Sequence, residues 1–254
     1  MGAAGSANNA SNSQAKAKIY NSTDSTVSQK VTNQEVANAK IDAKTRVRTS
    51  PNTTADKPRR SLKWRVVDLV VAAILGVACG VIFQFWNWAG AAAYNTLDAL
   101  TPGVAGIVSG IWYMGGVVGA LVIRKPGAAL FVELLAAIVS ALLGSQWGIA
   151  AVFDGLAQGI GAEIIFLLFA YRKFGIGTAM LSGLLAGAGA VLRWGFFSAG
   201  WATGSLYLTV YTITNLVSGA ILGGIVAWLL VKGLAATGVL NRFAVGRELH
   251  SNAA

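Results

Sequence analysis

Four ionisable side chains fall within long apolar runs of the sequence, where a charge is costly. They are Glu133, Asp154, Glu163 and Arg193. An ionisable group at membrane depth costs about 3 kcal/mol on insertion scales, so each of the four is a candidate for function. Glu133 and Glu163 lie at comparable depth near one predicted membrane face. Three roles fit that pair: salt bridges with Arg124, Lys125 or Arg172, binding of a cation, and sharing of a proton.

A second group of polar side chains has the spacing of one helix face near the opposite membrane surface. Asp154 lies about 9 Å below the predicted outer end of its helix, at 1.5 Å per residue. Gln158 follows Asp154 at the i+4 spacing, one turn deeper on the same helix face. Tyr211 and Asn215 repeat this spacing at similar depth on another predicted helix. Together these residues could line one outward-facing pocket, with Trp147 and Trp86 as flat walls suited to an aromatic ligand. Alternatively, the four pair with one another as interhelical hydrogen bonds, worth about 0.6 kcal/mol each.

The elements that must position these residues are transmembrane helices. Hydrophobic residues make up 55% of the 254 and charged residues only 12%, about half the share in soluble domains. Apolar runs long enough to cross a bilayer, about 20 helical residues, occur six times. They span residues 66–88, 104–123, 128–146, 149–171, 174–194 and 208–231. We therefore predict an all-α membrane protein with six transmembrane helices. The connection 87–103 is either a lid or interfacial helix, or an ordinary surface loop.

Loop charge predicts the orientation and the partner class. Lys and Arg cluster before residue 66, at 124–125, at 172–173 and after residue 231, all on one side of a six-pass trace. The positive-inside rule places that side, with both termini, in the cytoplasm of a multi-pass cell-membrane protein. Residues 1–65 hold 12 of the 20 basic residues, so the net charge of +10 reflects a cytoplasmic flank and predicts no nucleic-acid partner.

The domain organisation follows from composition. Residues 1–60 contain few large apolar side chains and are predicted to be a disordered cytoplasmic tail. Residues 61–248 form the predicted six-helix domain, and residues 249–254 a short C-terminal tail. One cysteine, Cys79, and one histidine, His250, leave zinc sites, disulfide frameworks and histidine-dependent triads without their components. We predict no metal, no cofactor and no catalytic residue.

Small residues four apart mark the faces on which membrane helices pack closely. Such rows occur in the first, fifth and sixth predicted helices: Ala72, Gly76 and Gly80; Gly183 and Gly187; Gly219 and Gly223. The last two are expected to be internal seams. The first row could be an internal seam or a face for a partner protein.

Several segments in a fixed order resemble one known family. They are GIWYM (110–114), RKPGAAL with Glu133 (124–133), LLGSQWG (142–148), QGIGAE (158–163), LVSGAILGG (216–224) and TGVLNRFAVGRE (237–248). This order resembles the YkoE family, which consists of substrate-binding S components of energy-coupling factor (ECF) vitamin transporters. The resemblance covers about residues 62–248.

The resemblance implies a six-helix S-component fold that binds thiamine or its hydroxymethylpyrimidine precursor. It implies a transmembrane coupling protein and two ATP-binding-cassette ATPases as partners, and a subunit that is not itself an enzyme. No GxxxxGK[ST] phosphate-binding motif occurs in the chain, so ATP hydrolysis would take place elsewhere. Trp112, Glu133, Gln158 and Glu163 stand inside the matching segments and are implied to bind substrate. The row from Ala72 to Gly80 resembles the coupling face of S components. The alternative function is a self-sufficient proton-coupled transporter that uses Glu133 and Glu163.

Overall fold

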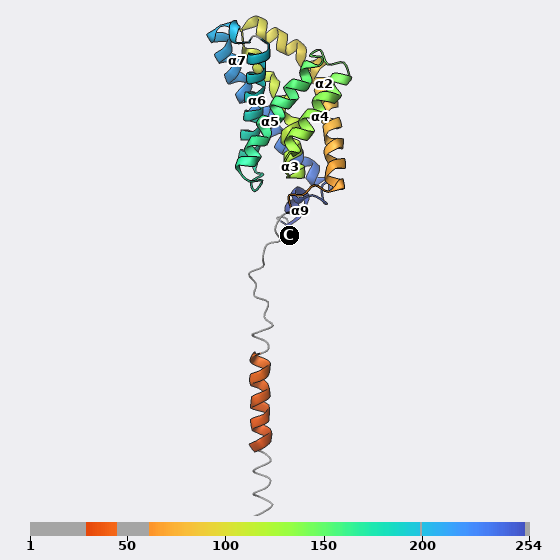
Figure 1. Cartoon of the computed structure of the whole chain (residues 1–254), viewed down its shortest axis with the longest axis vertical. Coiled ribbons are helices and arrows are strands. Elements are labelled where there is room, and N and C mark those ends of the chain that lie inside the picture. The colour runs from red at the N-terminus through yellow and green to blue at the C-terminus, as the bar shows by residue number, and fades with distance from the viewer. Residues whose placement is uncertain (1–28, 45–60, 199, 252–254) are drawn as a thin grey trace, which may run out of the picture. The chain divides into compact units, whose positions relative to one another are not determined.

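A computed structural model describes residues 29–44, 61–198 and 200–251, with side chains up to residue 248 in the last range (Figure 1). The chain divides into two units, residues 1–60 and 61–254. In the first unit, residues 29–44 form a helix whose residues are all exposed. This helix differs from the expected disorder of residues 1–60. The rest of that prediction lies outside the described residues.

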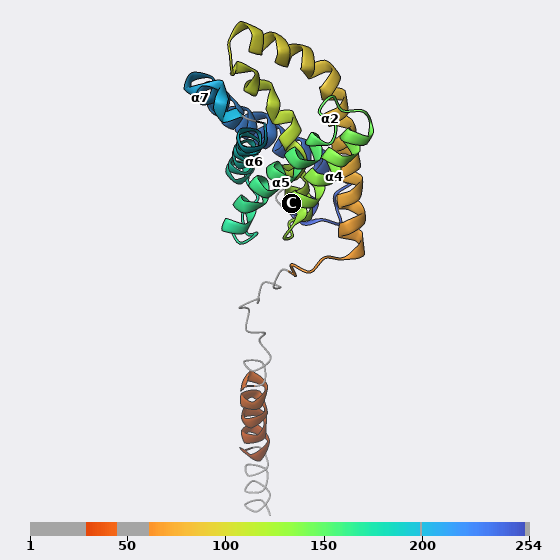
Figure 2. The same cartoon turned by 45° about the horizontal axis from the view of Figure 1, so that its top comes forward.

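The second unit begins with α2 (Val66–Leu100), a 35-residue helix. At its start the Asp68 carboxylate accepts a 2.7 Å hydrogen bond from the Arg65 backbone N–H and forms an ion pair with the Arg65 guanidinium group. The helix runs up one side of the bundle, and its last turns cross the end of the bundle (Figures 1 and 2). The segment 87–100 is therefore helical, which agrees with the helical alternative for this connection and excludes an ordinary loop there.

The centre of the bundle is a chain segment buried on all sides. The 3-10 helix η1 (Val104–Tyr113) leads directly into α3 (Met114–Ile123), and all ten residues of α3 are buried. Such uniform burial explains why this segment is apolar all round and has no polar face.

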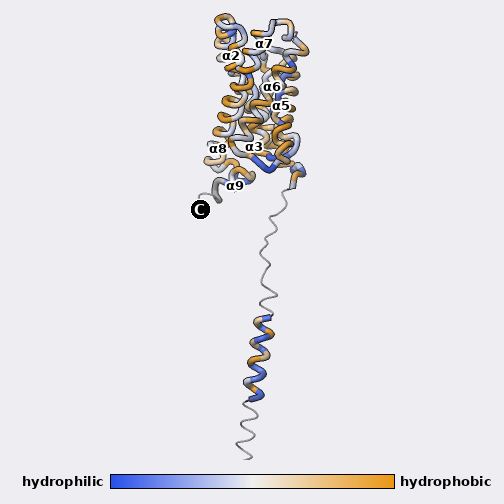
Figure 3. The backbone as a smooth tube through the Cα atoms, turned by 90° about the vertical axis from the view of Figure 1, so that its left-hand side faces the viewer, coloured by the Kyte–Doolittle hydropathy of each residue, from blue (hydrophilic) through white to orange (hydrophobic). Residues whose placement is uncertain are grey.

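The remaining helices are α4 (Ala128–Leu142), α5 (Ala150–Leu168), α6 (Ile176–Phe197), the short η2 (Gly200–Thr203), α7 (Ser205–Ser218), the π-helical η3 (Gly219–Val226), α8 (Ala227–Ala236) and α9 (Ala244–Ser251). Most of them pack around α3, whereas η2 and α7 pack against α6 and, in the case of α7, also against η1. The segments α7, η3 and α8 follow one another without a break. Figure 3 shows the apolar residues spread over the length of these helices.

The small residues of the fifth and sixth predicted helices form an internal seam, as predicted. A Cβ atom on Gly187 would lie 2.7 Å from the Asn215 carbonyl oxygen, and one on Gly223 would lie 3.2 Å from the Gly110 carbonyl oxygen. Gly183 and Gly219 face each other across α6 and η3, backbone against backbone. Any side chain at these positions would push the helices apart.

The row in the first predicted helix is also internal. Ala72 is fully buried, a Cβ on Gly76 would lie 2.7 Å from Leu135 Cδ2, and one on Gly80 would lie 2.8 Å from the Ala136 carbonyl oxygen. The row thus holds α2 against α4 within this chain. The expectation that it faces a partner is corrected, because its surface is already occupied.

Among the described residues, five helical segments are long and apolar enough to cross a membrane: 66–100, 104–123, 150–168, 176–197 and 205–236. The remaining predicted span corresponds to α4, an apolar helix of 15 residues. The chain is therefore an all-helical, multi-pass membrane protein in the part that the structure describes.

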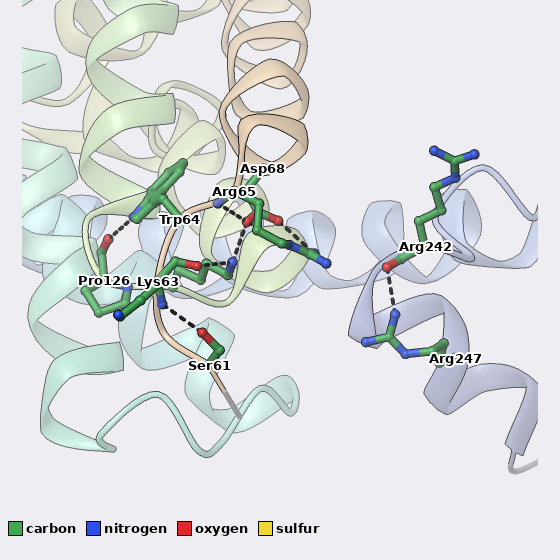
Figure 4. Close-up of polar contacts among 9 residues, drawn as sticks. Ser61, Lys63, Trp64, Arg65, Asp68, Pro126, Arg242 and Arg247 are labelled. Atoms are coloured by element: carbon green, nitrogen blue, oxygen red, sulfur yellow. Dashed lines mark hydrogen bonds and ion pairs between the residues drawn. The ribbon is translucent and has the colours of Figure 1, made fainter. Parts of the chain in front are cut away.

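The segment before α2 is fixed to the loop between α3 and α4 (Figure 4). The Lys125 ammonium group donates to the Lys63 carbonyl oxygen at 2.5 Å and also bonds the Asp68 carboxylate. Trp64 Nε1 donates to the Pro126 carbonyl oxygen at 2.9 Å. These contacts tie the start of the bundle to the turn that precedes α4.

The neighbouring residue of the same loop holds the other end of the chain. Arg124 forms a two-pronged ion pair with Glu248 of α9, at 2.5 and 2.8 Å, and its guanidinium carbon lies 4.6 Å from the ring centre of Phe174. The start of α2, the α3–α4 loop, the α5–α6 loop and α9 therefore meet at one end of the bundle.

Candidate functional site

A cavity of about 130 Å³ opens near the other end of the bundle, and side chains from six of its elements line it. Its walls are mainly aromatic: Phe83, Tyr94, Trp112, Tyr113, Trp147, Trp194 and Tyr211. Between them lie the polar side chains Asn87, Ser109, Ser140, Ser145, Asp154, Gln158 and Arg193. Flat apolar walls with a few convergent hydrogen-bonding groups are typical of a site for a small aromatic ligand.

Five of the nine side chains predicted to bind substrate line this cavity. They are Trp112, Trp147, Asp154, Gln158 and Tyr211. Asp154 and Gln158, predicted to share one helix face, both lie on α5 and line the cavity.

Gln158 is linked to Glu133, which lies behind the wall. Its amide nitrogen, turned toward its two acceptors, is 3.2 Å from Glu133 Oε1 and 3.2 Å from the Trp112 carbonyl oxygen. Glu133 is buried, and its Oε2 accepts a hydrogen bond of 2.5 Å from the Gly116 backbone N–H near the start of α3. Glu133 is therefore placed to orient Gln158, and it does not line the cavity itself.

Asp154 and Arg193 are the charged residues of the lining. Arg193 Nε and Nη2 bond the two carboxylate oxygens of Asp154 in a fork, and Nη1 donates to Ser198 Oγ at 3.2 Å. A paired carboxylate and guanidinium leave the lining without net charge. The sequence analysis singled out both residues but did not pair them.

Asn215 supports the cavity from behind. It is fully buried and accepts a hydrogen bond from the hydroxyl group of Tyr113, while its amide nitrogen donates to the Tyr211 carbonyl oxygen at 2.8 Å. Asn215 therefore fixes Tyr113, which lines the cavity.

Glu163 has a different environment. Its carboxylate accepts backbone hydrogen bonds from Gly127 (2.6 Å), Ala129 (2.8 Å) and Leu130 (3.3 Å), and one from the Tyr171 hydroxyl group (2.5 Å). A carboxylate in that position satisfies the free N–H groups at the start of α4 and interacts favourably with the helix dipole. The structure thus places Glu163 as a cap on α4, outside the cavity.

Trp86 is also turned away from the cavity. Its Nε1 donates to the Val108 carbonyl oxygen at 3.1 Å, and its ring lies against Gly90. The next residue, Asn87, lines the cavity instead and was not among the predicted site residues.

Asn87 lies at the centre of a buried polar network. Its Nδ2 is within 3.1 Å of Gln84 Oε1, Ser140 Oγ and Ser145 Oγ, and its Oδ1 accepts a 3.0 Å hydrogen bond from Trp112 Nε1. Small polar side chains within apolar runs give little signal in a sequence. The i, i+3 spacing of Gln84 and Asn87 in an otherwise apolar helix was the one available sign.

Comparisons with known proteins bear on this arrangement. Residues 67–189 match a family described as the permease component of an ABC-type cobalt transport system. The chain is 34% identical over 188 residues to the putative HMP/thiamine permease protein YkoE of Bacillus subtilis strain 168. The matched segment covers 73% of this chain and 92% of that protein. It is similar to the crystal structure of an S component of an ECF transporter, with a TM-score of 0.69 and 32% identity. That match covers 75% of this chain and 95% of the other.

Proposed function

Because the chain belongs to the YkoE family of ECF-transporter S components, we propose that it binds thiamine or hydroxymethylpyrimidine in the aromatic cavity and serves their import. The observation that carries the proposal is the lining: Trp112, Trp147 and Tyr211 provide flat surfaces, and Gln158 adds a polar amide group. The related B. subtilis protein is named for these two ligands, which share an aminopyrimidine ring.

The cavity offers complementary groups for such a ring. Aromatic side chains can stack on the pyrimidine, and their π faces attract the thiazolium cation of thiamine. The Gln158 amide and the serine hydroxyl groups provide donors and acceptors for the ring nitrogens and the amino group. The Asp154 carboxylate is held by Arg193, so the ligand meets a fixed ion pair.

We further propose that the chain crosses the cell membrane six times with both termini in the cytoplasm. Basic side chains support this orientation, because the end of the bundle where α2 starts also carries the α5–α6 loop and α9. Those exposed side chains are Lys63, Arg65, Arg172, Lys173, Arg242 and Arg247. The cavity then opens near the outer surface, and α4 with its flanking residues makes the shortest crossing.

Delivery of the ligand requires partners in this proposal. The S component takes up ligand outside and reorients against a transmembrane coupling protein, and two separate ATPases supply the energy. The chain acts as a binding subunit and not as an enzyme.

Reconstitution in proteoliposomes tests this division of labour. The chain alone should bind labelled thiamine or hydroxymethylpyrimidine without accumulating it, and accumulation should require the coupling protein, the ATPases and internal ATP. Accumulation by the chain alone, abolished when the proton gradient is collapsed, would instead support the proton-coupled transporter. The hydrogen bonds of Glu163 to the start of α4 argue against its use as a proton carrier.

A further inference from the structure

The hydrogen bond between Asn87 and Trp112 joins α2 to η1 across one edge of the cavity. Trp112 Nε1 donates to Asn87 Oδ1 at 3.0 Å, and both side chains line the cavity. An indole N–H that is removed from water needs such a partner, because leaving it unpaired costs about as much as a lost hydrogen bond.

Asn87 cannot turn its amide without losing contacts. The residue is 4% exposed, and three acceptors surround its nitrogen: Gln84 Oε1 at 3.0 Å, Ser140 Oγ at 3.0 Å and Ser145 Oγ at 3.1 Å. Gln84 Oε1 can only accept and the Trp112 indole N–H can only donate, so a flipped amide would oppose both of these partners. The network therefore directs Oδ1 toward the indole of Trp112.

Trp112 in turn connects the walls of the cavity. Its ring meets that of Trp147 edge to face at a centroid distance of 6.3 Å, and its carbonyl oxygen lies 3.2 Å from the Gln158 amide nitrogen. A rotation of the Trp112 side chain would therefore change this aromatic wall, while the contact of Gln158 with the Trp112 backbone would stay in place.

We propose that Asn87 is a positioning residue that sets the orientation of Trp112 and thereby determines how tightly the cavity holds a flat aromatic ring. The inference rests on the proposed function for the identity of the ring. The Asn87–Trp112 contact itself does not depend on that function.

The contact can be tested without ligand. In a sample labelled with ¹⁵N-tryptophan, the variant Trp112→Phe identifies the indole N–H resonance of Trp112 by its disappearance. Asn87→Leu should shift that resonance strongly, whereas Asn95→Leu, a matched change at an exposed position of the same helix, should leave it in place. An unchanged Trp112 resonance in a folded Asn87→Leu sample would overturn the inference. If Asn87→Leu does not fold, Asn87→Ser keeps a hydroxyl group in the network but is too short to reach the indole.

The role in binding is tested by a double-mutant cycle with thiamine and, separately, hydroxymethylpyrimidine. Asn87→Leu and Trp112→Phe should each raise Kd about tenfold, the effect of losing one buried hydrogen bond. The double variant should also lie about tenfold above wild type, because both changes remove the same contact. An increase near a hundredfold would mean that the two residues act independently and would overturn the inference.

The two proposals fail in different ways. If wild type binds neither probe, the proposed function is wrong, and so is the role of Asn87 in binding this ring. A shifted indole resonance in Asn87→Leu would still establish the Asn87–Trp112 contact. If wild type binds and the Asn87→Leu variant binds equally well, the positioning role falls and the proposed function stands.

Discussion

With its amide group oriented so that the nitrogen faces acceptors, Gln158 in the cavity wall donates to Glu133 Oε1 behind that wall at 3.2 Å. Glu133 is itself held by the Gly116 backbone N–H near the start of the buried helix α3. A side chain that lines the cavity is thus oriented by a carboxylate, and that carboxylate is fixed by the most buried element of the fold. Rigid support of this kind reduces the ordering cost of binding.

Replacement of Gln158 should weaken binding more than folding. In Gln158→Leu the cavity loses the amide oxygen as a hydrogen-bond acceptor, and we expect Kd for thiamine or hydroxymethylpyrimidine to rise about tenfold. Titration calorimetry of the purified chain measures this change. Gln146→Leu is the matched control, since Gln146 is exposed and does not line the cavity. Equal affinities for wild type and Gln158→Leu would contradict the placement of the ligand.

Replacement of Glu163 should reduce the stability of the fold more than the affinity for the ligand. Glu163→Gln keeps an acceptor but loses the charge at the start of α4, so we expect the protein to lose about 1–2 kcal/mol of stability with little change in Kd. Thermal unfolding and calorimetry on the same sample separate the two effects. A large loss of affinity at unchanged stability would show that Glu163 contributes to ligand binding.

Tyr171 provides a related test outside the membrane-spanning segments. Burial, followed by the hydrogen bond to Glu163, raises the pKa of the Tyr171 hydroxyl group. A raised pKa in the folded state means that the contribution of Tyr171 to stability is complete below its unfolded pKa of about 10 and is lost as the pH rises above that value. The loss of stability between about pH 9 and pH 11 should therefore be smaller in Tyr171→Phe than in wild type. Identical pH profiles would show that the hydroxyl group does not contribute.

The row of small residues in α2 should be essential for folding. Gly76→Leu would force a side chain into Leu135 of α4, so we expect a strong loss of folded protein in detergent. Val77→Leu, at an exposed position of the same helix, should be tolerated. A Gly76→Leu variant that folds and binds normally but no longer assembles with a coupling protein would restore the partner-face interpretation.

The Arg193–Asp154 ion pair should behave as a unit. Arg193→Gln leaves an unpaired carboxylate in the cavity wall, which costs more than the loss of both charges. We therefore expect a lower unfolding temperature for Arg193→Gln than for the double variant Arg193→Gln/Asp154→Asn. If the double variant were the less stable of the two, the charges would have separate roles.

Hydropathy predicted five helical segments long enough to span a membrane, because the bilayer requires long apolar segments, whereas the predicted span 128–146 corresponds to the 15-residue helix α4. The end of α2 was harder to place, since residues 87–100 are too polar to resemble a span and yet continue the helix. The row at Ala72, Gly76 and Gly80 was correctly recognised as a packing face. Periodicity alone does not say which helix packs there, and the partner is α4 of the same chain.

The site shows the same limit. Residues whose types are unusual in apolar segments, such as Asp154 and Gln158, could be selected from the sequence. Glu133 and Glu163 were predicted to lie at similar depth, and depth alone did not distinguish their roles. In the structure Glu133 supports the cavity and Glu163 caps α4. Asn87 was missed because it falls where the predicted span 66–88 meets the connection 87–103, and its contacts with Trp112 and the two serines join segments far apart in the sequence.

The most direct test of the account fills the cavity from within. Ala151 lines the cavity, whereas its neighbour Ala150 lines an apolar groove on the outer side of α5 and α6. Calorimetric titration of the purified chain with thiamine and with hydroxymethylpyrimidine, in the absence of ATP and partners, should show saturable binding of at least one ligand by wild type and by Ala150→Phe. Ala151→Phe should bind neither while remaining folded. Equal binding by Ala151→Phe, or no binding by a folded wild-type chain, would contradict the central claim that this cavity holds the ligand.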